Sequence, residues 1–98
     1  MLQMERVWNV ADGELQLSWE AETNEVTSII FLSSALLITS GGEGLVKIWN
    51  FQERNGDSPL LLRSLKHHSY GILCMALAPR GDWLATGGAD KKVKLWDL

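Results

Sequence analysis

Short apolar segments alternate with turn residues along the whole chain of 98 residues. Most segments are six to eight residues long and rich in Val, Ile, Leu and Trp, which is typical of β-strands and too short for capped helices. Asp12-Gly13 and Asn55-Gly56 suit hairpins that need a positive φ, and Pro-Arg-Gly-Asp at residues 79–82 is another tight reversal. The pattern predicts nine strands, near residues 5–10, 14–20, 25–32, 35–40, 45–51, 60–66, 72–78, 83–88 and 92–97.

Tryptophan divides this pattern into units. Three of the five tryptophans have similar neighbours, in Arg6-Val7-Trp8-Asn9-Val10, Lys47-Ile48-Trp49-Asn50-Phe51 and Lys94-Leu95-Trp96-Asp97-Leu98. Residues 37–43 also match residues 84–90 at a constant offset of 47, and residues 26–31 match residues 72–77 at an offset of 46. The length differences fall in turns, above all in an expected loop at residues 52–58. A period of this size indicates repeated structural units.

Two of the predicted strands, near residues 25–32 and 72–78, are apolar on both faces, so both faces require cover. Trp19 and Trp83 lie outside the repeated contexts, and we expect them in the core or between units. Cys74 has no nearby cation in the sequence that would lower its pKa, which favours an inert thiol in the core.

Composition and charge narrow the class of protein. The chain is 46% hydrophobic and 21% charged with a net charge of −3, which is typical of one soluble folded domain. An acidic balance predicts neither a nucleic acid nor an anionic membrane as partner. No apolar run is long enough to span a bilayer, and the first residues lack the apolar core of a signal peptide. With one cysteine, we expect an intracellular location, cytoplasmic first and nuclear as the alternative.

The repeated units resemble the WD repeats of β-propellers, and the resemblance covers nearly the whole chain. The family pattern is a Gly-His pair, a strand bearing Ser or Thr, an Asp in a turn and a terminal Trp-Asp. The second unit follows this pattern with His67-His68, Thr86, Asp90 and Trp96-Asp97. The first unit departs from it with Ala21-Glu22, Glu43 and Trp49-Asn50, although it keeps Thr39.

This resemblance implies an all-β fold made of four-stranded antiparallel blades, here a partial propeller of about two and a third repeats. Residues 1–20 would be the end of a preceding repeat, residues 21–51 a degenerate first repeat, and residues 52–98 a second repeat with the full signature. The chain would then hold one complete blade, one blade without its outer strand and half of another. Because stacked repeats need neighbours for stability, the rest of a longer propeller or further copies of the chain would complete the ring.

The family pattern also implies a hydrogen-bonded relay inside each blade, whose members are costly to bury unpaired. In the second blade the relay residues are His68, Thr86, Asp90 and Trp96. The degenerate set in the first blade is Glu22, Thr39, Glu43 and Trp49. We expect that set to form the relay only in part, because a carboxyl group does not copy imidazole, and we expect apolar packing to hold the first blade.

No other motif predicts an enzyme, a cofactor or a metal. The Gly-rich residues 40–47 lack phosphate-loop spacing, and two histidines with one cysteine supply too few metal ligands. The Arg80-Gly81-Asp82 tripeptide occupies a predicted turn, and Lys91, Lys92 and Lys94 are typical of a solvated strand edge. His68, Thr86 and Asp90 have the order of the structural relay rather than of an exposed catalytic triad.

The function implied by the resemblance is a non-enzymatic scaffold that binds proteins or peptides. The partner-binding residues would lie on the loops of one face, at Thr23, Asn24, Glu25, Ser69, Tyr70 and Gly71. Gly42 and Ala89 would share that face. The alternative is an architectural wall of a large assembly, which would use blade edges and the loop at residues 52–58.

Overall fold

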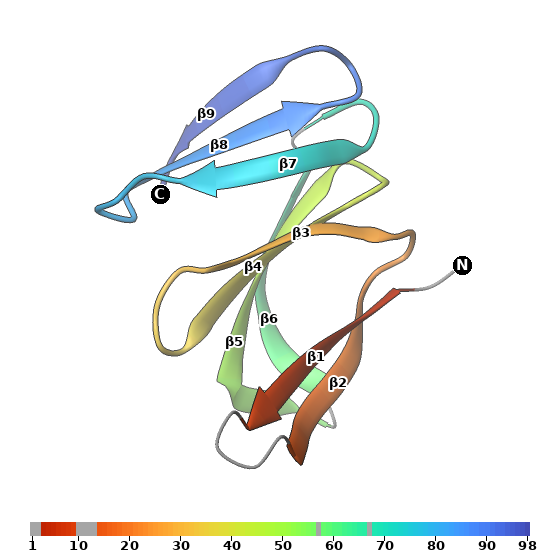
Figure 1. Cartoon of the computed structure of the whole chain (residues 1–98), viewed down its shortest axis with the longest axis vertical. Coiled ribbons are helices and arrows are strands. Elements are labelled where there is room, and N and C mark those ends of the chain that lie inside the picture. Colours follow the sequence, from red (N-terminus) through yellow and green to blue (C-terminus); the bar gives the residue numbers. More distant parts are fainter. Residues whose placement is uncertain (1–2, 10–13, 57, 67) are drawn as a thin grey trace.

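The structure is a computed structural model of the chain, and it describes residues 3–9, 14–56, 58–66 and 68–98. The described residues form nine strands in three antiparallel sheets, one strand for each predicted segment (Figure 1). The two-stranded sheet contains β1 (Gln3–Asn9) and β2 (Glu14–Glu22). The four-stranded sheet contains β3 (Val26–Phe31), β4 (Leu36–Gly41), β5 (Leu45–Asn55) and β6 (Ser58–Lys66). The three-stranded sheet contains β7 (Ile72–Leu77), β8 (Trp83–Gly88) and β9 (Val93–Asp97).

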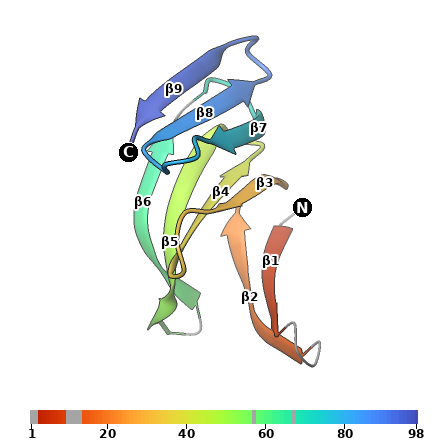
Figure 2. The same cartoon turned by 60° about the vertical axis from the view of Figure 1, so that its left-hand side comes forward.

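Each sheet is a meander in which every strand pairs with its neighbour in the chain. The four-stranded sheet lies between the other two, and β3 contacts β7 of the next sheet (Figures 1 and 2). The all-β architecture expected from the sequence is therefore confirmed. The described residues include no helix long and apolar enough to cross a membrane.

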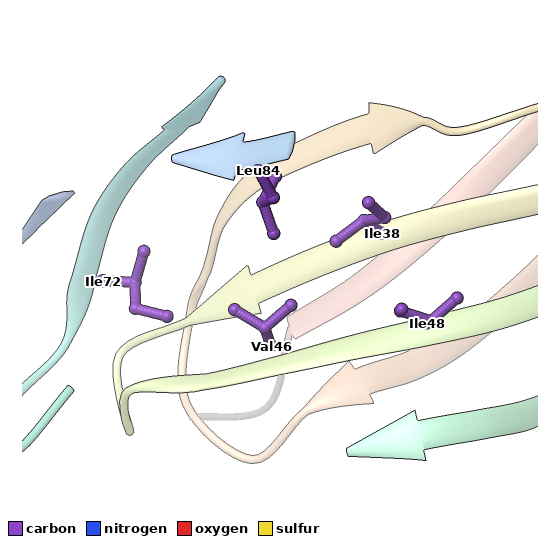
Figure 3. Packing of buried hydrophobic residues seen from close by; sticks show 5 residues of the cluster. All are labelled: Ile38, Val46, Ile48, Ile72 and Leu84. Atoms are coloured by element: carbon purple, nitrogen blue, oxygen red, sulfur yellow. The ribbon is translucent and has the colours of Figure 1, made fainter. Parts of the chain in front are cut away.

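Apolar side chains fill the two spaces between the sheets. Ile38, Val46 and Ile48 of the middle sheet pack against Ile72 and Leu84 of the three-stranded sheet (Figure 3). Between the middle and two-stranded sheets, a second cluster contains Trp19, Ala21, Leu37 and Trp49. At the sequence offset of 47, Leu37 corresponds to Leu84 and Trp49 to Trp96. The chain thus uses the same kind of interface twice.

Two predicted turns are present, and one predicted loop is not. Gly56 has a φ of +67°, as the Asn55-Gly56 hairpin requires, and the Gly81 N–H donates to the carbonyl of Ala78 at 2.8 Å. The other dipeptide, Asp12-Gly13, lies outside the described residues. The loop expected at residues 52–58 is instead largely strand, because β5 continues to Asn55 and Arg54 pairs with Pro59.

Burial of two side chains was predicted wrongly. Trp19 is buried as expected, but Trp83 is 46% exposed and Cys74 is exposed. Leu73, the neighbour of Cys74 on β7, is also exposed. These side chains lie on the three-stranded sheet, and no described element covers its outer face. The apolar sequence of β7 predicts that other elements pack on both of its faces, but among the described residues only one face is packed.

Candidate functional site

The second repeat contains a buried chain of hydrogen bonds that crosses its sheet. His68 Nδ1 lies 2.9 Å from Asp90 Oδ1, and His68 Nε2 lies 2.8 Å from the Thr86 hydroxyl. His68 and Thr86 are almost fully buried. Since a carboxylate only accepts, the His68 Nδ1–H donates to Asp90, and Nε2 is left to accept from Thr86. Trp96, the fourth predicted member, packs at the edge of the core between the sheets.

Asp90 is held by more than the imidazole. Its carboxylate also accepts from the backbone N–H of Lys92 at 3.1 Å and from that of Ser69 at 3.4 Å. Burial alone would raise the pKa of Asp90, but the hydrogen bonds from His68, Lys92 and Ser69 outweigh it and lower the pKa below its ordinary value. The turn before β9 and the loop before β7 are therefore tied to one charged group.

The first repeat contains a matching chain of hydrogen bonds in which a carboxyl group replaces imidazole. The Thr39 hydroxyl donates to Glu22 Oε2 at 2.8 Å, and the Trp49 indole N–H donates to Thr39 Oγ1 at 3.0 Å. Glu22 stands 46 residues before His68, at the equivalent place in the repeat. Glu22 thus takes the place of the imidazole, because a carboxyl oxygen accepts from Thr39 as the ring nitrogen does from Thr86. That apolar packing mainly holds this blade stays a prediction.

The surroundings of Glu22 favour its protonated form. Burial raises the pKa of Glu22, the Thr39 hydroxyl and the Lys47 ammonium lower it, and the Glu43 carboxylate raises it again, with a net increase. The side chain is 3% exposed, and Lys47 Nζ donates to the carbonyl of Ala21 at 2.9 Å. The predicted relay residue Glu43 thus acts on Glu22 through the charge of its carboxylate, which raises the pKa of Glu22.

We expect Glu22→Gln to change how stability depends on pH. The folded-state pKa of Glu22 is raised, so its stabilising contribution is complete below about 4.5, the unfolded value, and is lost as the pH rises through the folded pKa. Gln keeps an oxygen that accepts from Thr39 but does not titrate. Urea titrations should therefore show the wild type gaining free energy of unfolding relative to Glu22→Gln as the pH falls from neutral towards that value. Glu25→Gln, at an exposed position, is the control, and parallel pH curves for wild type and Glu22→Gln would contradict the assignment.

The predicted binding loops lie together. Thr23, Asn24, Glu25, Ser69 and Tyr70 are exposed, and Gly71 is partly buried. The Gly42 N–H donates to the carbonyl of Glu25 at 3.1 Å, and the Ala89 N–H donates to that of Gly71 at 2.9 Å. The loop that enters each blade is therefore fixed to a turn of the same blade, and both loops remain open to solvent. Tyr70 is 66% exposed.

The chemistry available at the second relay is structural. A nucleophile must reach its substrate, but Thr86 is 1% exposed and its hydroxyl is already engaged by His68. Within the described part of the chain, no three potential ligands among His, Cys, Asp and Glu come together as a metal site would require.

Comparison with known proteins gives a consistent result. The family model described as WD domain, G-beta repeat (WD40) matches residues 13–50 and 60–97. The chain is 33% identical over 99 residues to the ribosome biogenesis protein WDR12 homolog of Chlamydomonas reinhardtii, covering 94% of this chain and 22% of that protein. It is 26% identical to WD repeat and SOCS box-containing protein 1 of Xenopus tropicalis, with 95% and 22% covered. The chain therefore spans about a fifth of the length of these relatives.

Solved structures share the fold. A chain in the crystal structure of the mitotic checkpoint complex matches with a TM-score of 0.84 at 23% identity, covering 97% of this chain and 29% of that one. The computationally designed Ika4 protein matches with a TM-score of 0.73 at 22% identity, covering 95% of this chain and 53% of that one. At these identities the likeness concerns architecture, so the three sheets are blades of a propeller.

Proposed function

The chain belongs to the WD40-repeat family, and from this premise we propose that its exposed loops bind protein or peptide partners as part of a non-enzymatic scaffold. WD40 proteins are generally interaction scaffolds, and this chain is a fragment of such a propeller. One observation supports the proposal most directly: on the loop face, backbone hydrogen bonds join Glu25 to Gly42 and Gly71 to Ala89. It combines rigid backbone with exposed side chains, of which Tyr70 is the largest.

Tyr70 and Glu25 are the specific contacts in this proposal. An exposed tyrosine on a fixed loop supplies contact area with little loss of conformational entropy, and tyrosine is enriched among residues that dominate binding energy. Gly42 and Gly71 lie against each other between the two blades, and the Glu25 side chain lies beside Gly42. A partner segment that crosses this joint would therefore meet Glu25 on the first blade and Tyr70 on the second.

A double substitution, Glu25→Ala with Tyr70→Ala, tests this proposal. In quantitative affinity capture with the full-length protein, we expect recovery of direct partners to fall about tenfold or more, as for loss of a dominant contact. Leu62→Ala, which alters an exposed residue on the outer strand β6, is the matched control and should leave recovery unchanged. Equal recovery with the double variant and wild type would reject the loop face as the binding surface.

The architectural alternative also has an observation in its favour. The long hairpin of β5 and β6 carries exposed Leu61 and Leu62. If the protein contacts its neighbours by blade edges, Leu62→Ala would reduce recovery of partners while the double variant of Glu25 and Tyr70 would not. The same set of three proteins therefore separates the two functions.

A further inference from the structure

Two loops of the proposed binding face meet at a pair of glycines. A Cβ added to Gly71 would lie 2.9 Å from the carbonyl oxygen of Gly42, and a Cβ added to Gly42 would lie 2.5 Å from Glu25 Oε1. The turn between β4 and β5 therefore lies directly against the loop before β7, at one end of the sheets (Figure 1). We call this place the glycine joint, and it consists of Glu25, Gly42, Glu43, Tyr70 and Gly71. Both of its sides belong to the described residues.

Backbone carbonyl groups gather around the glycine joint. The carbonyl oxygens of His68 and Tyr70 both approach Gly44, at the end of the turn between β4 and β5. In the same turn, the carbonyl of Glu43 accepts from the Lys66 ammonium at 2.7 Å. Carbonyl oxygens are acceptors with partial negative charge, so this arrangement favours a cation. The Lys66 contact shows that the turn already binds one.

Two carboxylates add full negative charge to the glycine joint. Glu25 is exposed and Glu43 is half-buried, and neither takes part in an ion pair among the described residues. The charge of Glu43 is felt in the blade, because it contributes to the raised pKa of Glu22. Lys66 lies on β6, at the opposite edge of the sheet from β3, which the Glu25 loop enters. The Glu25 carboxylate is therefore left for a cation from outside the chain.

We propose that the glycine joint binds a basic side chain, arginine or lysine, of a partner peptide. The Glu25 carboxylate pairs with the cation, and the Tyr70 ring, on a side chain that is 66% exposed, supplies a cation–π contact. Lys91 and Lys92, in the turn after β8, repel the cation from the second blade and direct it towards Glu25. The proposal rests on the loop-face function and specifies the chemistry of its partner.

Charge complementarity selects a basic partner over the other classes. An acidic segment at the glycine joint would be repelled by Glu25 and Glu43. An apolar segment would cover the Glu25 carboxylate without pairing it, and removal of an unpaired charge from water costs free energy. A basic side chain compensates the charge that its own binding takes out of water. It is therefore the occupant that the joint favours.

Photo-crosslinking with the full-length protein identifies what lies at the glycine joint. The photoreactive residue p-benzoylphenylalanine replaces Asn24, which is exposed and adjacent to Glu25, so that the proposed contacts stay intact. We expect most crosslinked partner segments to carry arginine or lysine within about three residues of the crosslink, the reach of a short extended segment. The same substitution at exposed Arg80 is the control and should show no such enrichment. Crosslinks without basic enrichment reject the basic ligand alone, whereas no crosslinks at Asn24 reject the loop face and this proposal with it.

A synthetic peptide with the sequence of a crosslinked segment then measures the pairing with Glu25. Fluorescence anisotropy gives the Kd of the peptide, and of a copy with glutamine in place of its basic residue, for wild type and Glu25→Gln. We expect glutamine in the peptide to weaken binding about tenfold to wild type but only about twofold to Glu25→Gln, because an ion pair cannot be lost twice. Glu53→Gln, which removes an exposed carboxylate on β5, should behave as wild type. Equal weakening for wild type and Glu25→Gln overturns the proposal.

Discussion

Replacing Gly44 by alanine is expected to lower the free energy of unfolding by about 4 kcal/mol, the sum of left-handed strain and a backbone clash. Gly44 has a φ of +83°, and an added Cβ would lie well inside van der Waals contact with the carbonyl oxygens of His68 and Tyr70. Both obstacles are backbone atoms, so no side-chain rotation relieves the clash. Urea unfolding followed by tryptophan fluorescence would measure the loss.

Gly56→Ala is the matched control for this substitution. Gly56 has a similar φ of +67°, but a Cβ added there, at the tip of the β5–β6 hairpin, would meet no other atom within 4 Å. We expect a loss of about 1 kcal/mol from backbone strain alone. Equal losses of free energy of unfolding for the two variants would contradict this prediction, because they would show that the loop before β7 moves to accommodate the added Cβ.

The Gly44 contact matters because it joins two blades. The carbonyl of Gly44 accepts from the His68 N–H at 3.3 Å, and the Lys66 ammonium donates to the carbonyl of Glu43 at 2.7 Å. The turn of the first blade therefore supports the loop that carries the relay histidine and Tyr70. A displacement at Gly44 would move both the relay and the proposed binding face.

The sequence predicted the strands well, because repetition supplies each local pattern more than once. The Trp49 and Trp96 contexts, with constant offsets between them, place six strands of two blades without any knowledge of tertiary contacts. The extension of β5 to Asn55 was missed because Gln52, Glu53 and Arg54 are polar, so apolar periodicity does not mark them as strand.

The sequence predicted the first relay only in part, because residue identity was compared rather than hydrogen-bonding capacity. Thr39 needs an acceptor, and either a ring nitrogen or a carboxyl oxygen satisfies it. The signal was present in the offset of 46 that aligns Glu22 with His68. The predicted burial of Cys74 and Trp83 was wrong for another reason. An apolar strand indicates that another element must cover it, but not whether the described residues include that element.

The relay in the second blade leads to the other large expected effect. His68→Ala removes the bridge between Thr86 and Asp90 and leaves the hydroxyl of the buried residue Thr86 without its acceptor. We expect the free energy of unfolding to fall by about 3 kcal/mol, from the lost imidazole packing and the unpaired buried hydroxyl. Tyr70→Ala, two residues away at an exposed site, should change stability by less than about 0.5 kcal/mol.

Substitutions at Thr86 separate the hydrogen bond from packing. Thr86→Ser keeps the hydroxyl, whereas Thr86→Val keeps the shape and leaves His68 Nε2 without its donor, so valine should cost more free energy of unfolding than serine. If the hydrogen bond carries the effect, His68→Ala combined with Thr86→Val should cost less than the two single losses added together, because one bond cannot be lost twice. Additive losses would mean that each side chain stabilises the blade by packing alone, and the relay would then be a contact without energetic coupling.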